Sequence, residues 1–114
     1  MPSWKLVLAS LLLLSGCGST GSVDDRARNS AKIHTELAAS YFERGQYAIA
    51  LQELGVALQS DDSYAPAYNV RGLVRMTLRE DTQAEADFRR SLKLEPGNAA
   101  THNNFGWFLC HRGR

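Results

Sequence analysis

From residue 31 onward, hydrophobic and small residues recur every three to four positions, which is the spacing of an amphipathic helix. No segment alternates apolar and polar residues for long enough to predict a strand. Gly45 and short turn-forming clusters separate the periodic segments. The pattern predicts an all-α chain with helices near residues 31–44, 47–60, 65–78, 82–94 and 99–112.

The predicted helices repeat with a period of 34 residues. A shift of the sequence by 34 aligns Ala31, Ala65 and Ala99. The period resembles that of the tetratricopeptide repeat (TPR), a helix–turn–helix unit whose helices A and B touch through small residues. The second repeat carries the signature small, aromatic and proline positions most completely, as Tyr68, Gly72, Ala84, Phe88 and Pro96.

The resemblance implies an all-α TPR solenoid of about two and a half repeats. Their bounds are 31–64 for the first repeat, 65–98 for the second, and 99–114 for the first helix of an incomplete third. That helix contains Phe105 and Trp107, and the sequence holds no following helix to cover them. We therefore expect the chain to be the front part of a longer protein.

The first sixteen residues have the pattern of a secretory signal peptide. Lys5 precedes the apolar run 6–14, which as a helix is about 13 Å long, too short for a bilayer core of about 30 Å. The sequence Leu-Ser-Gly-Cys at 14–17 resembles a bacterial lipobox, in which the cysteine thiol, here Cys17, is diacylated and becomes the first residue. We expect residues 17–30 to form the lipidated cysteine and a flexible tether. The resemblance to bacterial lipoproteins implies that Gly18, in place of an aspartate after the cysteine, favours the outer membrane.

Composition and charge argue against several other classes of protein. Thirteen lysines and arginines against twelve acidic residues give a net charge of +1, which argues against binding to nucleic acid driven by net charge. The 114 residues contain two cysteines, too few for a disulfide framework or a zinc site. Cys110 and His111 are adjacent and point about 100° apart on a helix, so they cannot act as nucleophile and base. We predict no catalytic residues, no metal site and no cofactor.

The TPR resemblance also implies a concave groove lined by the A helices. The groove positions predict an apolar strip flanked by two amides, which would suit an extended or helical peptide. Its residues are Phe42, Leu73, Met76 and Trp107, with Asn69 and Asn103 at the side. A missing helix that covers part of this strip is the alternative. The Lys/Asn/Lys/Arg set of chaperone-binding TPR proteins is not present, which disfavours a chaperone adaptor.

Polar residues at A-helix positions are predicted to have structural roles. His34 and His102 fall where an aromatic residue is usual, so we expect both to pack. Arg71, Arg75 and Arg79 form a row at helical spacing and need anionic partners if buried. The candidate partners are Glu53, Glu85 and Asp87; the alternative for the row is a partner-binding patch.

A lipobox, a short tether and a TPR array together resemble the type IV pilus biogenesis/stability lipoproteins, the pilotins (PilF/PilW family). The run Asn-Asn-Phe-Gly-Trp-Phe-Leu-Cys at 103–110 is similar to the start of their third repeat. The resemblance implies a non-enzymatic outer-membrane lipoprotein that binds the pilus secretin subunit and assists its localisation and multimer assembly. The alternative is a generic TPR lipoprotein that scaffolds outer-membrane protein assembly or cell-wall hydrolases.

Overall fold

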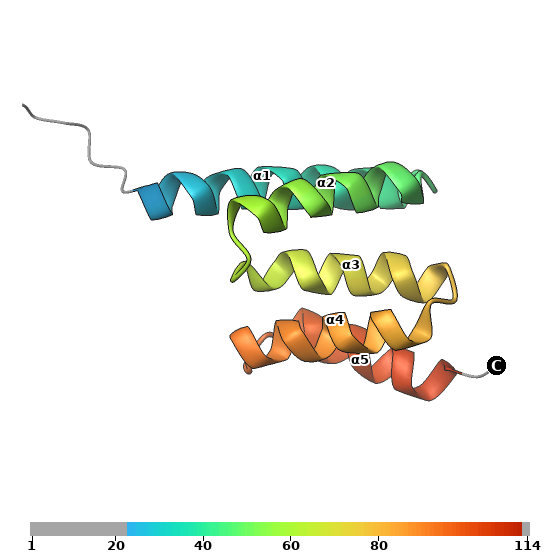
Figure 1. Ribbon diagram of the computed structural model, residues 1–114. Helices are drawn as coiled ribbons and strands as arrows, with labels where there is room; N and C mark the ends of the chain where they lie inside the picture. The colour runs from blue at the N-terminus through green and yellow to red at the C-terminus, as the bar shows by residue number, and fades with distance from the viewer. Residues whose placement is uncertain (1–22, 113–114) are drawn as a thin grey trace, which may run out of the picture.

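The computed structural model describes residues 23–112, which form five α-helices and no strand. The helices stack in chain order, with α1 and α2 side by side at one end, α3 in the middle, and α4 and α5 at the other end (Figure 1). The predicted all-α helix–turn–helix solenoid is confirmed, and the four later helices match their predicted bounds to within one residue. The five helices are α1 (Val23–Glu43), α2 (Tyr47–Ser60), α3 (Ala65–Thr77), α4 (Asp81–Leu94) and α5 (Ala99–His111).

The first helix is longer than predicted. Residues 23–30, part of the predicted tether at 17–30, are instead the first two turns of α1. They are helical because they have partners in the α2–α3 loop: Arg28 lies 3.5 Å from the Asp61 carboxylate and over the ring of Tyr64 at 5.5 Å. Two aspartates in the first turn also stabilise the positive end of the helix dipole.

Small residues allow the A and B helices of each repeat to approach closely, as predicted. Ala38 and Ala50 in the first repeat and Ala84 in the second are fully buried. At Gly72, a Cβ atom would lie only 2.7–2.9 Å from three ring carbons of Phe88. The fully buried Phe88 ring thus occupies the space that any other residue at position 72 would need.

The turns between the A and B helices have the same geometry in both repeats. In the first, Gly45 has φ +74° and the N–H of Gln46 donates to the carbonyl of Tyr41 at 2.9 Å. In the second, 34 residues later, Arg79 has φ +63° and the N–H of the next residue donates to the carbonyl of Arg75 at 2.9 Å. Arg79 therefore adopts the left-handed conformation for which glycine is the usual residue.

The second repeat is joined to the third by a buried polar contact. The hydroxyl of Ser91 donates to the carbonyl of Ala65 at 2.9 Å and lies 3.0 Å from the hydroxyl of Thr101. Both side chains are fully buried, and the Thr101 N–H is capped by the Asn98 side chain at 3.0 Å. The contact connects α3, α4 and α5 without leaving either hydroxyl unpaired.

Two of the three arginines in the predicted row pair with one buried carboxylate. Arg71 donates twice to Asp87, from Nε and Nη2, and Arg75 donates to it at 2.9 Å. Asp87 is 3% exposed, and both arginines are half-buried. Of the other candidates, Glu53 accepts from His34, and Glu85 pairs with Arg89 and Arg112 instead. For Arg71 and Arg75, the row is a structural ion-pair cluster.

We expect Gly72→Ala to lower the free energy of unfolding by about 1–3 kcal/mol, because the new methyl group and the Phe88 ring cannot occupy the same space. Gly55→Ala is the matched control: Gly55 lies inside α2 and a Cβ there meets nothing within 4 Å. That control should raise stability by about 0.5–1 kcal/mol through helix propensity. Urea denaturation of both variants checks the prediction, and equal effects of the two substitutions would contradict it.

We expect Asp87→Asn to destabilise the fold by about 2–3 kcal/mol, because two half-buried guanidinium groups then lose their shared counter-charge. Glu85→Gln removes a carboxylate from more exposed pairs and should cost less than about 1 kcal/mol. Thermal unfolding followed by circular dichroism compares the two. A loss for Glu85→Gln as large as that for Asp87→Asn would mean that burial does not set the difference.

Candidate partner-binding groove

A pocket of about 380 Å³ lies between the C-terminal ends of α3 and α5 and the start of α4. Met76 and Trp107, two of the predicted groove residues, both line it. Its lining combines apolar side chains with polar and charged ones. The lining residues are Met76, Thr77, Arg79, Asp81, Trp107, Phe108, His111 and Arg112.

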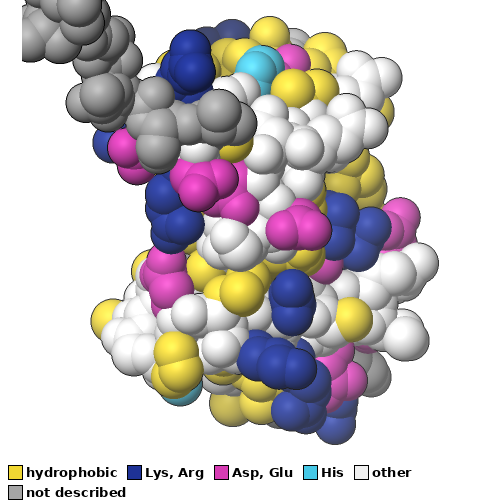
Figure 2. Space-filling view, turned by 60° about the vertical axis from the view of Figure 1, so that its left-hand side comes forward, with side chains coloured by type: hydrophobic (Ala, Val, Ile, Leu, Met, Phe, Trp, Pro, Cys, Tyr) yellow, Lys and Arg dark blue, Asp and Glu magenta, His cyan; other side chains and the backbone are white. Residues whose placement is uncertain are grey.

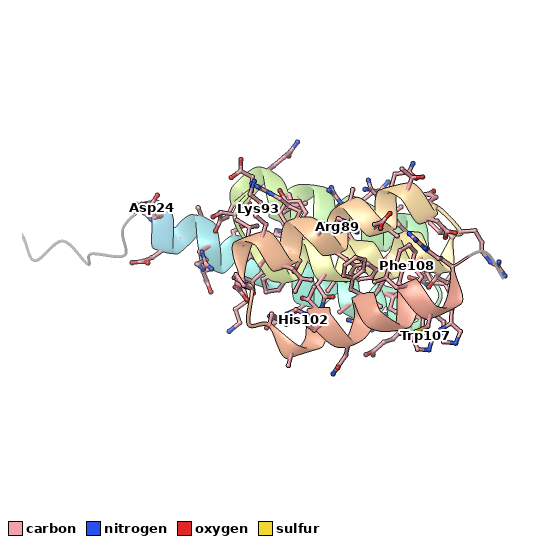
Figure 3. The ribbon with its side chains drawn as sticks, turned by 90° about the horizontal axis from the view of Figure 1, so that it is seen from below. Asp24, Arg89, Lys93, His102, Trp107 and Phe108 are labelled. Carbon is pink, nitrogen blue, oxygen red and sulfur yellow. The ribbon has the colours of Figure 1, made fainter. Side chains whose placement is uncertain are left out.

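Trp107 is the most exposed large hydrophobic residue of the described part of the chain, at 54%. Its ring stacks on that of His111 with 4.1 Å between centroids, and the His111 Nδ1 lies 2.8 Å from the Trp107 carbonyl oxygen. The neighbouring Phe108 points from α5 into the molecule, whereas Trp107 lies at its outer edge (Figure 3). The stacked pair offers a flat aromatic surface to an incoming side chain.

The other apolar residues of the predicted strip belong to two separate clusters. Leu73 and Met76 pack against the buried side chains Ala84, Phe88 and Phe108. Phe42 packs against the first repeat's core, with its ring 5.7 Å from that of Tyr47. The strip is thus partly core, and the exposed part of it is centred on Trp107.

The two amide side chains of the predicted groove, those of Asn69 and Asn103, differ in burial. Asn69 is half-buried, and its Oδ1 accepts a hydrogen bond from the side chain of Asn104 at 3.0 Å. Asn103, the predicted companion, is exposed. The sequence analysis did not include Asn104. The repeat pattern could have indicated it, because residues 69 and 104 occupy adjacent A-helix positions of consecutive repeats.

In the first repeat, the residue that corresponds to Asn69 makes no side-chain hydrogen bond among the described residues. Thr35 corresponds to Asn69 and is 4% exposed, yet among the described residues its hydroxyl has no hydrogen-bond partner. The position equivalent to Asn104 is here Val70, which has no polar group to offer. The amide pair of the second interface is therefore not reproduced at the first.

The three histidines have hydrogen-bond partners rather than metal-like surroundings. The Nδ1 of His34 lies 2.7 Å from the Glu53 carboxylate, and the Nε2 of His102 lies 2.6 Å from a backbone carbonyl. The prediction that both histidines pack holds in part for the half-buried His34, while His102 is exposed. Within residues 23–112, no three histidine, cysteine or acidic side chains come together as metal ligands.

Cys110 is a free, exposed cysteine on α5. The Cys110 side chain is exposed because α5 is the last helix of the stack, and no described helix lies on its far side (Figure 1).

A second, more polar pocket of about 530 Å³ lies where the start of α1 meets the α2–α3 loop. Its charged residues include Asp24, Asp25, Arg28 and Asp61. The hydroxyl of Ser63 donates to the Asp61 carboxylate at 2.6 Å and holds the pKa of that carboxyl below its usual value. This hydrogen bond serves to shape the loop.

The predicted lipidation site, Cys17, lies outside the described residues, as does the predicted signal peptide at 1–16. Among the helices that the structure describes, none has the length and apolar character needed to cross a bilayer. The lipid anchor stays a prediction from the sequence.

No protein-family model matches this chain. The type IV pilus assembly protein PilF of Pseudomonas aeruginosa is 31% identical over 96% of the chain, which spans 45% of PilF. Two solved TPR structures are similar at 30% identity. The TPR domain of Arabidopsis OM64 has a TM-score of 0.67 and covers 72% of this chain, with 68% of its own length matched.

The second structure is the first TPR of Spaghetti (RPAP3) bound to an HSP90 peptide, with a TM-score of 0.64 over 70% of this chain and 64% of that one. The 34-residue period, the paired helices and these similarities agree with one another. The chain belongs to the tetratricopeptide-repeat family of protein-interaction modules.

Proposed function

We propose that this protein is a lipid-anchored outer-membrane TPR protein that binds the type IV pilus secretin subunit and assists its localisation and multimer assembly. The observation that carries the proposal is the similarity to PilF over nearly the whole chain. Because the chain spans less than half of PilF, the activity of the whole relative comes to it as a proposal.

The mechanism is tethered binding without bond-breaking chemistry. Diacylation of Cys17 would hold the protein at the membrane surface, since two or more acyl chains anchor stably where one does not. The pocket beside Trp107 and Met76 would then receive an apolar side chain of the secretin subunit. Tethering raises the effective concentration of the bound subunit at the membrane.

The direct test is the amount of secretin multimer on a denaturing gel, in cells that lack this gene and in cells given back residues 1–114. We expect the multimer to be lost on deletion. Rescue by this chain would show that two and a half repeats suffice, and loss without rescue would assign the task to a longer form. An undiminished multimer in the deletion strain would contradict the proposal and favour a generic TPR scaffold.

Cys17→Ala tests the anchor within the same strains. Without the thiol, no thioether to diacylglycerol can form, so we expect the variant to be released from the membrane or to stay unprocessed. Metabolic labelling with a radioactive fatty acid, followed by membrane fractionation, measures this. A labelled, membrane-bound variant would refute lipidation at this residue.

Trp107→Ala tests the groove. The exposed ring contributes little to the core, so helix content should change little, while affinity for the secretin subunit should fall at least tenfold, or about 1.4 kcal/mol. Leu109→Ala, at 41% exposure on the same helix but outside the pocket lining, is the matched control. Binding measured by surface plasmon resonance decides, and unchanged affinity for Trp107→Ala would reject this groove.

A further inference from the structure

Four large apolar side chains are exposed on the outer side of the first repeat. They are Ile33 and Leu37 of α1, at 53% and 40% exposure, and Ile49 and Val56 of α2, at 39% and 41%. We call these four residues the end face. None of them lines the pocket at the other end of the molecule, so the end face is separate from the proposed groove.

Helical spacing and two hydrogen bonds place the four residues on one surface. Ile33 and Leu37 are one turn apart on α1, on either side of His34 in the sequence. Ile49 and Val56 are two turns apart on α2, on either side of Glu53. His34 bonds to Glu53 at 2.7 Å, and Ser30 lies 3.1 Å from Ser60, so these sides of α1 and α2 meet. Hydrophobic side chains gather at the top of the molecule, over α1 and α2 (Figure 2).

The later repeats show what covers this part of an A helix. The positions of Ile33 and Leu37 correspond to Thr101 and Phe105 on α5. Thr101 is fully buried against Ser91 of α4, and the Phe105 ring lies 5.8 Å from that of Phe88 of α4.

On α3, the residue that corresponds to Ile33 is Ala67, which is fully buried in the core shared with α2. Ala67 of α3 thus packs against the B helix before it, as Thr101 and Phe105 of α5 do. Arg71, which corresponds to Leu37, instead pairs with Asp87 of the B helix that follows. On α1 the same positions are large, apolar and exposed. The surface has the chemistry of a repeat interface, and among residues 23–112 no helix completes it.

The charges on the end face define the chemistry of its occupant. The two ionisable groups at its centre, His34 and Glu53, are bonded to each other, so neither requires a charged partner. A complementary surface is therefore apolar and uncharged at its centre. An amphipathic helix with apolar residues at i, i+4 and i+7 has this character.

We propose that the end face binds one amphipathic α-helix of a partner protein, which lies across α1 as α4 lies across α5. A second copy of this chain is the less suitable occupant. The exposed apolar area of four side chains is on the order of a few hundred Å², below the roughly 800 Å² that each partner buries in a stable dimer. One docked helix needs no more than such a stripe. The proposal does not depend on the identity of the secretin as cargo.

The test uses the 114-residue chain and two fluorescent synthetic peptides with an alanine and glutamine background. One has leucines at i, i+4, i+7 and i+11, and the other has the same composition with the leucines spread around the helix. Fluorescence anisotropy gives the dissociation constants. We expect the striped peptide to bind at least tenfold more tightly, and Ile33→Ser combined with Leu37→Ser to abolish that preference. Leu109→Ser, at similar exposure on α5, is the matched control and should keep it.

Circular dichroism shows whether the double variant keeps its helix content, as its exposed positions predict. Amide chemical shifts then locate the peptide independently of any substitution, and we expect the changes to fall on α1 and α2. Equal binding of the two peptides, unchanged binding to the double variant, or shifts confined to the Met76–Trp107 pocket would overturn the proposal. So would a concentration-dependent dimer that the double variant abolishes, since a second copy would then occupy the face.

Discussion

The ring of Phe88 against the bare backbone of Gly72 is the contact on which the rest of the structure depends. The ring is fully buried and lies close to α3 on one side, while the rings of Phe105 and Phe108 lie 5.8 and 5.7 Å away on the other. One side chain thus fixes the distance between α3 and α4 and provides the surface on which α5 rests. The spacing of the second and third repeats, and with it the pocket beside Trp107, follows from this contact.

The fold was largely predictable because its determinants are local. Small and aromatic residues at a 34-residue period fixed four helices to within one residue and identified the close approaches at Gly72 and Ala84. The start of α1 was missed for a physical reason. Its first turns are held by Asp61 and Tyr64, more than thirty residues away, and helix periodicity carries no information on such partners.

The groove was predictable in part. The repeat positions identified Met76 and Trp107, which do line one pocket. The same positions could not show that Leu73 is taken up by the core, or that Asn69 is bonded to Asn104 rather than available to a ligand. Which side of an A helix faces a ligand and which faces the next repeat depends on the angle between repeats, and the sequence does not encode that angle in a readable pattern.

The polar contacts between A helices have a consequence for the order of the repeats. Asn69 meets Asn104 across the second interface, whereas Thr35 and Val70 occupy the equivalent places at the first. If two copies of the second repeat followed one another, Asn69 of one copy would face the isopropyl group of Val70 of the next. The Asn69 amide would then have no hydrogen-bond partner at that interface. The two interfaces are therefore not interchangeable. Stacking the repeats in another order would lose the hydrogen bond between Asn69 and Asn104, so these side chains favour the order that the chain has.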